Sequence, residues 1–425
     1  MGAELPLELS ATAARSKLNN SGGRNHVLLL EPHFDGHRGV WVQWMALGLS
    51  ARGLRVSVVT MAESVSTAVF RELVNSGVEV AVYAAPRRSV GVHRSASTLK
   101  LLMSEWRAWS LLQGMYELGV SRVPVGTVVI PYLDYALHAI ALRGSPFGQT
   151  SWVGIAMRPT FHFGVVGVKA PVARFINIRR ELFRRLLIVP TLQCCLSVDA
   201  TLVDFARSRW RDSGKKVSLL SDPAMPFAPR DRAGARRRLG VHVESPTILV
   251  YGWLTRNKGL GSLLRILVRA QQLRHFHVLV VGSQDFGIPE ILKSEDAEVL
   301  RVQQRLHVVG GWASDKTEAE AFVAADVVWL GYEQHWQSSG VLAQACHAGR
   351  PVLACDEGLI GWSVNRFKCG ITVAMNDQVA VADALLRLAG DTTQRVAWLE
   401  GCRRYAAIHT VENAVDVINA AIGRR

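Results

Sequence analysis

The sequence lacks several features that would place it in a common class. Its six cysteines form no C-x-x-C pair, so neither a zinc site nor a redox pair is indicated. No apolar run has the length needed to span a bilayer. The first 25 residues are mixed and polar, without the apolar segment of a secretory signal. We therefore expect residues 1–25 to form a mobile tail and the cysteines to be reduced core thiols of a cytoplasmic protein.

Acidic residues are outnumbered by basic ones. The 425-residue chain has 35 Asp and Glu against 49 Lys and Arg, a formal net charge of +14. Such a charge is typical of a solvated basic surface, or of a protein that binds an anionic substrate, an anionic membrane or nucleic acid. Because aromatic and basic residues are not interleaved and no nucleic-acid motif occurs, nucleic acid is not an expected partner. With 49% hydrophobic residues, the chain should fold into two to three globular domains.

Short apolar runs alternate with stretches long enough to be helices, first over residues 26–220 and again over residues 246–373. This alternation predicts parallel sheets covered by helices on both faces. The expected strands are 26–31, 55–61, 78–83, 127–131, 150–157, 192–198 and 217–220 in the first half, and 246–251, 277–281, 306–309, 326–330, 351–355 and 370–373 in the second. The stretch 221–231 has three prolines and is interpreted as a linker, and residues 377–425 read as helical throughout. We therefore expect two Rossmann-like domains, residues 26–225 and 226–405.

The stretch from Trp336 to Asp356 has the clearest local pattern. Ser338 and Ser339 precede a short helix of small residues, which ends at Gly349 and leads into an apolar strand. Serine hydroxyls at a helix start can cap its free N–H groups. Those N–H groups and the helix dipole favour a phosphate or a hydroxylated ligand.

Two glycine loops follow expected strands. Gly36 and Gly39 follow the first strand, where glycine allows the backbone to approach a ligand. They do not form a G-x-G-x-x-G fingerprint, so an ordinary turn is the alternative. The loop from Gly252 to Gly259 follows the first strand of the second half and includes Lys258.

These motifs resemble the nucleotide-binding signatures of family 4 (group 1) retaining glycosyltransferases of the GT-B fold. The resemblance is carried by Gly349-Arg350-Pro351-Val352 and by the loop from Gly252 to Gly259. It implies an α/β architecture of two Rossmann-like domains facing a cleft, with the last helix, residues 406–425, returning towards the N-terminal domain. The family motif has two glutamates separated by seven residues, and Trp336 and Gln344 stand in their places.

The resemblance and the loop positions also imply a set of site residues. Lys258 and Arg256 are expected to neutralise a donor diphosphate, and Gln344 to bond ribose hydroxyls without a charge. His162 is expected to face the acceptor, and Gln337 to replace the polar group lost at Trp336. The full expected set is catalytic His162 and Gln337, with donor-binding Gly36, Gly39, Arg158, Gly252, Arg256, Lys258, Gly282, Ser338, Ser339, Gly340 and Gln344.

The function implied is that of a hexosyltransferase. It would transfer a sugar, with retention, from a nucleotide sugar to a hydroxyl of a saccharide or lipid-linked saccharide, as in polysaccharide biosynthesis, without a metal or other cofactor. Because Trp336 and Gln344 replace both glutamates, a non-catalytic nucleotide-sugar-binding protein is an alternative. A nucleotide-sugar 2-epimerase-like isomerase is another, and a membrane-associated scaffold is a more remote third.

The segment 172–188 combines apolar and basic residues at helical spacing. Phe175, Ile178, Leu182 and Leu186 are expected on one face, with five arginines on the others. Such a helix can lie on the anionic inner face of a membrane, which would make the protein peripheral. The alternative is an ordinary domain helix with one packed face and one solvated basic face.

Overall fold

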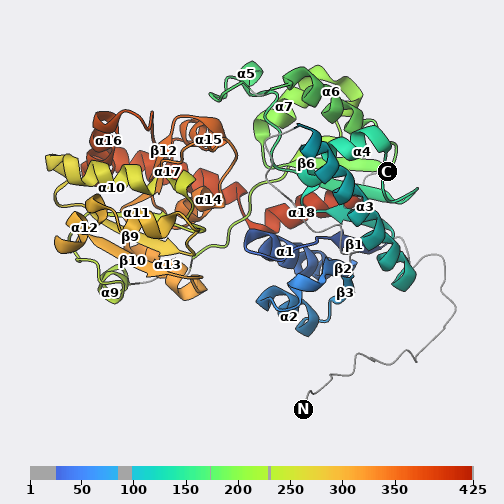
Figure 1. The fold of residues 1–425 in the computed structure, drawn as a ribbon, viewed down its shortest axis with the longest axis horizontal. Helices are drawn as coiled ribbons and strands as arrows, with labels where there is room; N and C mark the ends of the chain where they lie inside the picture. The colour runs from blue at the N-terminus through green and yellow to red at the C-terminus, as the bar shows by residue number, and fades with distance from the viewer. Residues whose placement is uncertain (1–24, 85–97, 173, 228–230, 424–425) are drawn as a thin grey trace, which may run out of the picture.

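The computed structural model describes residues 25–84, 98–172, 174–227 and 231–423. The expected tail lies outside this part of the chain except for Asn25, as do residues 228–230 of the expected linker. The described chain forms two parallel sheets with helices on their faces, one in each half (Figure 1). The predicted fold class, two Rossmann-like α/β domains, is therefore confirmed.

The N-terminal sheet has seven strands in the order β3-β2-β1-β4-β5-β6-β7, all parallel. Its strands are β1 (His26–Leu30), β2 (Arg55–Met61), β3 (Glu79–Tyr83), β4 (Thr127–Ile130), β5 (Ser151–Ala156), β6 (Leu192–Ser197) and β7 (Val217–Leu219). Its helices are α1 (His37–Ala51), α2 (Ala68–Asn75), α3 (Thr98–Arg122), α4 (Leu137–Arg143), α5 (Phe163–Val166), α6 (Ile176–Leu187), α7 (Ala200–Arg209) and α8 (Arg211–Gly214), with short 3-10 turns η1 (Ala62–Ser64) and η2 (Leu133–Tyr135). These strands match the predicted ones to within a few residues.

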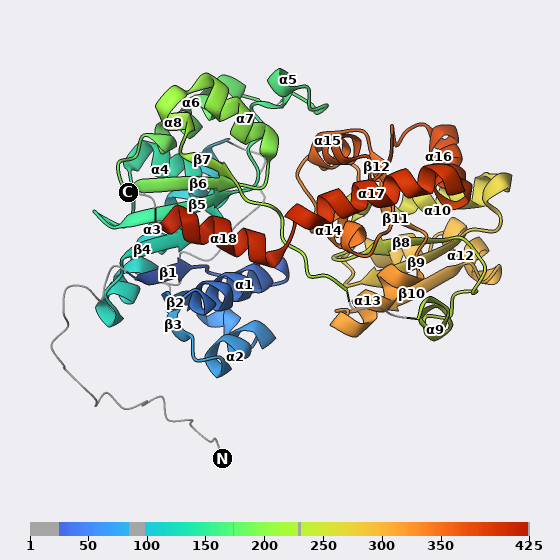
Figure 2. The same ribbon diagram turned by 180° about the vertical axis from the view of Figure 1, so that it is seen from behind.

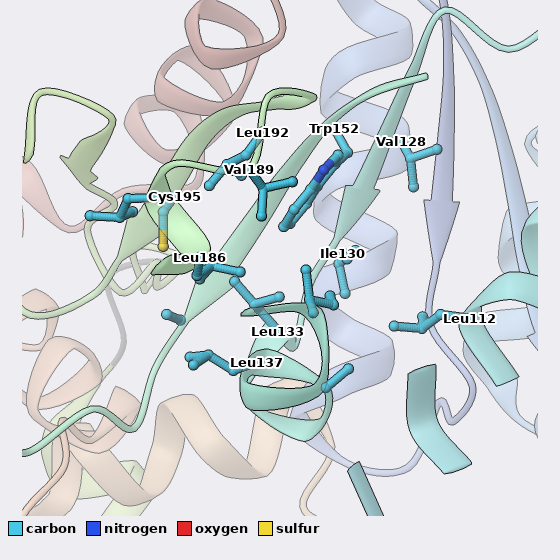
Figure 3. Packing of buried hydrophobic residues seen from close by; sticks show 14 of the residues in the cluster. Leu112, Val128, Ile130, Leu133, Leu137, Trp152, Leu186, Val189, Leu192 and Cys195 are labelled. Carbon is cyan, nitrogen blue, oxygen red and sulfur yellow. The ribbon is translucent and has the colours of Figure 1, made fainter. Parts of the chain in front are cut away.

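Both faces of this sheet are buried, as a parallel sheet requires. Along β1, Leu28 and Leu30 belong to the core on one face, and Val27 and Leu29 to the core on the other. Figure 3 shows the first of these cores, where the fully buried Trp152 lies among aliphatic side chains from the strands and from α4 and α6. The period-2 alternation of side chains thus supplies two hydrophobic layers from one continuous apolar run.

The C-terminal sheet has six parallel strands in the order β10-β9-β8-β11-β12-β13. Its strands are β8 (Thr247–Tyr251), β9 (His277–Gly282), β10 (Leu306–Gly310), β11 (Val327–Leu330), β12 (Val352–Cys355) and β13 (Gly370–Val373). Its helices are α9 (Arg232–Arg238), α10 (Leu260–Arg269), α11 (Ile288–Leu292), α12 (Glu295–Val302), α13 (Asp315–Ala324), α14 (Gly340–His347), α15 (Gly358–Phe367), α16 (Gln378–Gly390) and α17 (Thr392–Ile408), with 3-10 turns η3 (Arg256–Lys258) and η4 (Gln271–Leu273).

The chain passes between the two halves twice. The first crossing is the segment after β7, and the second joins α17 to α18 (Val411–Ile422), which packs on the N-terminal sheet (Figure 2). Gly48 of α1 allows the close approach of α18, because a Cβ there would lie 2.5 Å from a methyl carbon of Val415. The two crossings are hydrogen-bonded to each other, with the Ala224 N–H donating to the His409 carbonyl at 3.1 Å. They form a paired connection between the domains.

The apolar face expected for segment 172–188 is only partly buried: Leu186 is buried as expected, and Phe175 and Ile178 are not. The buried residues of α6 are Phe183, Leu186 and Leu187, whereas Phe175 and Ile178 are each 58% exposed. Phe175 precedes the first helical residue and has a left-handed backbone (φ 57°), so it is not in phase with the helix. Ala173 lies outside the described residues.

Candidate functional site

The carboxyl edges of the two sheets meet, because loops that follow strands in one half contact loops that follow strands in the other. A Cβ on Gly340, at the start of α14, would lie 4.0 Å from the imidazole of His37, at the start of α1. The Lys169 ammonium pairs with the Asp356 carboxylate at 2.6 Å across the same junction. In parallel α/β sheets, ligands bind at the carboxyl ends of the strands. This junction is therefore the candidate site.

Lys258 lies at the end of the loop after β8. Its ammonium donates a 2.6 Å hydrogen bond to the Tyr332 hydroxyl and stands 4.2 Å from the centre of that ring. Among the described residues, no carboxylate forms an ion pair with it. The Lys258 charge also lowers the pKa of the His37 imidazole, after the larger effect of burial. The lysine is thus a half-buried cation held by a neutral partner and available to an anion.

The start of α14 leaves backbone donors open. Ser339 is the N-cap residue, but its side chain accepts no capping hydrogen bond, contrary to the expectation for this serine pair. Its hydroxyl instead lies 3.5 Å from the Tyr332 hydroxyl, and Ser338 bonds the buried Asp222 carboxyl. The first N–H groups of the helix therefore remain unsatisfied by a cap and point to the same junction as Lys258.

Glycine allows tight contacts in two of the expected loops. A Cβ on Gly282 would lie 1.9 Å from the Gly252 carbonyl oxygen, and Gly282 has a positive φ of 136°. A Cβ on Gly252 itself would stand 3.9 Å from the Lys258 ammonium. In the N-terminal half, Gly39 lies in the first turn of α1 rather than in the expected loop, and a Cβ there would lie 2.5 Å from the Phe34 carbonyl oxygen. Gly39 thus allows α1 to pack on the preceding loop, whereas Gly252 lies beside the cation of the site.

Two buried carboxyl groups near this junction were not among the expected site residues. Burial raises the pKa of Asp222 to about 7, and its hydrogen bond from Ser338 opposes that effect. Burial raises the pKa of Glu31, which follows β1, to about 8, and the nearby Arg38 charge opposes that effect. No local sequence pattern identified either residue, because each is a single acidic residue in an irregular segment.

Gln344 lies one turn into α14. Its side-chain amide donates a hydrogen bond to the Glu318 carboxylate of α13. The Tyr251 hydroxyl, at the end of β8, bonds the same carboxylate. Gln344, the residue expected to bond the ribose, therefore has an acidic neighbour, Glu318, which the sequence analysis did not identify.

Arg256 and Arg158, the other basic residues expected in the site, are exposed, whereas Lys258 is half-buried. Arg256 forms an ion pair with Glu290 of α11, and both side chains are 64% exposed. Its role as the second diphosphate cation is therefore not supported by the geometry. Arg158 is exposed, stacks on Tyr135 at 5.5 Å, and its charge contributes to lowering the pKa of His335. Burial is the largest cause of that lowered pKa, and the Arg158 charge adds to it across the junction; the ligand contact of Arg158 stays a prediction.

The structure contradicts the role expected for His162. This side chain is fully buried, with Nε2 at 2.8 Å from the Asp199 carboxylate and 3.1 Å from the Thr201 hydroxyl. The rings of Phe161, Phe163 and Phe205 surround it. An acceptor cannot reach this histidine, so it stabilises the start of α7. Gln337 is half-buried beside His335, where it remains a candidate.

Trp336 belongs to a small apolar cluster that joins the two halves. It packs with Phe163, Val168 and Leu359, and its backbone carbonyl accepts the Leu359 N–H at 3.0 Å. The Gly358 N–H donates to the Lys169 carbonyl at 2.8 Å beside this cluster. A cavity of about 340 Å³ lies between the same two segments. Trp336 therefore contributes to domain contact rather than to polar chemistry.

Comparison with known proteins finds a family match in the C-terminal half of the chain. Residues 245–391 match the family model of Glycosyl transferases group 1. D-inositol 3-phosphate glycosyltransferase of Nocardia farcinica is 29% identical over 207 residues, 46% of this chain and 45% of that protein. The protein of the same name from Corynebacterium urealyticum is 31% identical over 195 residues, 44% of this chain and 45% of that one. The match thus spans a little under half of these relatives.

Solved structures share the whole fold. Sucrose-phosphate synthase from Thermosynechococcus elongatus has a TM-score of 0.66 at 16% identity, covering 93% of this chain and 98% of that one. Anabaena Alr3699/HepE in complex with UDP has a TM-score of 0.66 at 15% identity, covering 94% and 99%. WaaG, a glycosyltransferase involved in lipopolysaccharide biosynthesis, has a TM-score of 0.62 at 17% identity, covering 94% of this chain and 99% of that one. The fold of this chain is the GT-B fold of these glycosyltransferases.

Proposed function

We propose that this protein is a retaining glycosyltransferase that transfers a hexosyl group from a nucleotide sugar to a hydroxyl acceptor. The observation that carries the proposal is the position of Lys258, a cation without a carboxylate partner among the described residues, beside the open start of α14. The family match of residues 245–391 and the UDP-bound structural neighbour support a nucleoside diphosphate as the ligand of Lys258.

The chemistry required of this site is charge stabilisation. When the sugar leaves, negative charge develops on the nucleoside diphosphate. The Lys258 ammonium and the N–H groups at the start of α14 are placed to stabilise that charge without a metal ion. Because these groups are fixed before the reaction, they need little reorganisation. Retention and the identity of the acceptor belong to the proposal and are supported by the sequence resemblance.

A donor screen followed by a turnover assay tests this function. UDP-, GDP- and ADP-sugars are compared by thermal shift, since a ligand that binds only the native state raises the melting temperature. The bound donor is then incubated with saccharides, lipid-linked saccharides and D-inositol 3-phosphate, and the product anomer is determined by NMR. Transfer with retention supports the proposal. Binding without turnover identifies the non-catalytic alternative, and conversion of the donor without an acceptor identifies the isomerase.

We also propose that α6 and the preceding segment contact an anionic membrane surface. Val172, Phe175, Ile178 and Ile188 are exposed, at 83%, 58%, 58% and 57%, beside the arginines of α6. Large exposed apolar groups flanked by cations favour an anionic bilayer surface. Among the described residues, no helix is long and apolar enough to cross a membrane. A lipid-linked acceptor would be compatible with such a contact.

Vesicle sedimentation tests the membrane contact. The protein is mixed with neutral vesicles and with vesicles containing anionic phospholipid. We expect binding only to the anionic vesicles, and a loss of binding in the double variant Phe175→Ser, Ile178→Ser. Equal binding by this variant would contradict the proposal. The variant Val379→Ser, which also removes an exposed apolar side chain (69% exposed) but from the C-terminal half, is the control.

A further inference from the structure

A second cavity lies in the C-terminal half, at the edge of the sheet opposite the candidate site. It has a volume of about 420 Å³ and is lined by α9, by the segments that enter β8 and β11, and by the end of α16. Pro246 and Asp326 directly precede these two strands, which are five and four residues long, so the cavity lies roughly 15 Å from the carboxyl edge. Figure 2 shows α9 at the lower margin of the C-terminal half and α14 next to the N-terminal half. The cavity is therefore separate from the junction that contains Lys258.

One carboxylate in this cavity, that of Asp326, holds two arginines of α9. Asp326 accepts a hydrogen bond from Arg236 at 2.6 Å and from the Thr247 N–H at 2.9 Å, and it also pairs with Arg232. The Arg236 side chain is 4% exposed and donates from Nε to the Ala324 carbonyl at 2.9 Å. Arg236 is thus a structural link between α9 and the sheet, whereas Arg232 keeps donors in reserve.

Two more arginines lie close to this carboxylate. Within the described ranges, Arg350, just before β12, and Arg395, on α17, form no ion pair, and the Nε atoms of Arg350 and Arg232 are buried without a hydrogen-bond partner. Burial, followed by the charge of Arg232, lowers the pKa of Arg350 to about 10. The charges of Arg395 and Arg236 act in the same direction, and that of Asp326 opposes them. Four guanidinium groups therefore share one buried carboxylate.

The rest of the cavity lining fits a small anion with a carbon skeleton. Glu244 is the other carboxylate that lines the described part of the cavity, and it is exposed, so water and salt screen its charge. Val243, Pro246 and Ala389 add apolar surface. The volume is in the range of small-molecule sites. Because guanidinium N–H groups match the oxygens of a phosphate, a phosphate group suits the basic end of the cavity.

We propose that this cavity binds the phosphate group of a small phosphorylated metabolite, with Arg232 as a direct ligand and Arg350 and Arg395 contributing charge. A bound dianion would relieve the repulsion among these arginines and satisfy donors that have no partner in the described chain. Free phosphate shares this chemistry, and the apolar lining favours a phosphate monoester over it. The inference does not depend on the proposed function, because the cavity lies at the opposite edge of the sheet from Lys258.

Calorimetric titration with inorganic phosphate and with glycerol 3-phosphate tests the inference. Both probes are titrated into wild type and into Lys258→Ala, which lacks the cation of the candidate donor site. We expect both to bind Lys258→Ala, glycerol 3-phosphate more tightly. Adding Arg232→Gln should weaken both by about tenfold or more, the range for hydrogen bonds to a charged group. Absence of binding to Lys258→Ala would overturn the inference and leave the proposed function untouched.

The matched control is Arg237→Gln, which makes the same charge change on the same helix. Arg237 is 65% exposed, pairs with Asp231 at 3.8 Å and does not line the cavity. Its affinity for both probes should stay within about twofold of the parent protein, because salt screens an exposed charge. Equal losses in Arg237→Gln and Arg232→Gln would show a general attraction to a basic helix and would overturn the inference.

Two further variants separate folding from binding and identify the source of the phosphate. Arg350→Gln, on another element, should also weaken both probes, and it decides the matter if Arg232→Gln does not fold: unchanged affinity there overturns the inference. Ala389→Leu fills part of the apolar lining and should weaken glycerol 3-phosphate but not inorganic phosphate. Equal affinities of the two probes for the parent protein would assign free phosphate as the ligand of the same site.

Discussion

The Lys258 ammonium is fixed by Tyr332 rather than by an acid, with a 2.6 Å hydrogen bond to the hydroxyl and the ring centre 4.2 Å away. A neutral partner orients the lysine without cancelling its charge. A carboxylate partner would compete with an incoming diphosphate and weaken its binding. The Lys258–Tyr332 pair therefore preserves a cation at the carboxyl edge of the C-terminal sheet.

The first prediction concerns this cation. Lys258→Ala should weaken binding of the donor nucleotide by about 1.5–3 kcal/mol, because it removes a hydrogen bond to a charged group. Arg256→Ala is the matched control, since its guanidinium already pairs with Glu290 and is exposed. Calorimetric titration with UDP, or with the nucleotide identified in the donor screen, provides the measurement. Equal losses in the two variants would remove Lys258 from its assigned role.

The second prediction follows from the buried carboxyl of Asp222, whose pKa is raised to about 7 by burial. An unfolded aspartate has a pKa of about 3.9, so the native state binds the proton more tightly. The contribution of Asp222 to the free energy of unfolding should therefore be greatest below the unfolded pKa and should be lost as the pH rises from about 4 to about 7. The full shift corresponds to roughly 4 kcal/mol at about 1.36 kcal/mol per pKa unit.

Asp222→Asn tests this dependence, because the amide cannot titrate. Urea unfolding at pH 5 and pH 7.5 should show the variant gaining stability relative to wild type at the higher pH. The surface variant Asp212→Asn, whose carboxylate pairs with Lys215 in an exposed contact, should show no such gain. A constant difference between Asp222→Asn and wild type at both pH values would mean that Asp222 does not titrate in this range.

The sequence predicts the sheets and part of the site, for physical reasons that can be named. Buried parallel strands give continuous apolar runs, so nearly every strand could be placed. Lys258 was found because a glycine loop between a strand and a helix is a local pattern. Glu318 was not, because its contact with Gln344 joins residues 26 apart and leaves no periodic signal. Phe175 misled the reading of α6, since its left-handed backbone breaks the helical phase that periodicity assumes.

The third prediction concerns the close approach of the two glycine loops. Gly282→Ala should destabilise the protein by more than about 1 kcal/mol, because the new Cβ would meet the Gly252 carbonyl and the positive φ is unfavourable for alanine. Gly261→Ala is the matched control. Gly261 lies inside α10, and its added Cβ would be 3.8 Å from the nearest atom, at ordinary contact distance. There alanine should be neutral or stabilising, by up to about 1 kcal/mol. Thermal unfolding of both variants provides the measurement, and equal melting temperatures would refute the steric argument.

The last prediction concerns the contact between the two halves. Two kinds of interaction join them beside the cavity: the ion pair of Lys169 with Asp356, and the apolar packing of Phe163 and Val168 on Leu359. The Lys169 side chain is 58% exposed, so water and salt screen its ion pair and the pair should contribute little to the domain contact. Leu359 is 4% exposed, and its apolar contacts should dominate the domain contact.

Leu359→Asp should therefore separate the domains, because a carboxylate in this cluster would lose its hydration without a partner. We expect a larger radius of gyration by small-angle scattering in the absence of nucleotide, with a return towards the wild-type profile when the nucleotide binds both halves. Lys169→Ala should leave the profile almost unchanged. If Lys169→Ala opens the molecule as far as Leu359→Asp does, the ion pair rather than the apolar cluster holds the domains together. If neither variant opens it, the paired crossing of Ala224 and His409 is sufficient to fix the domains.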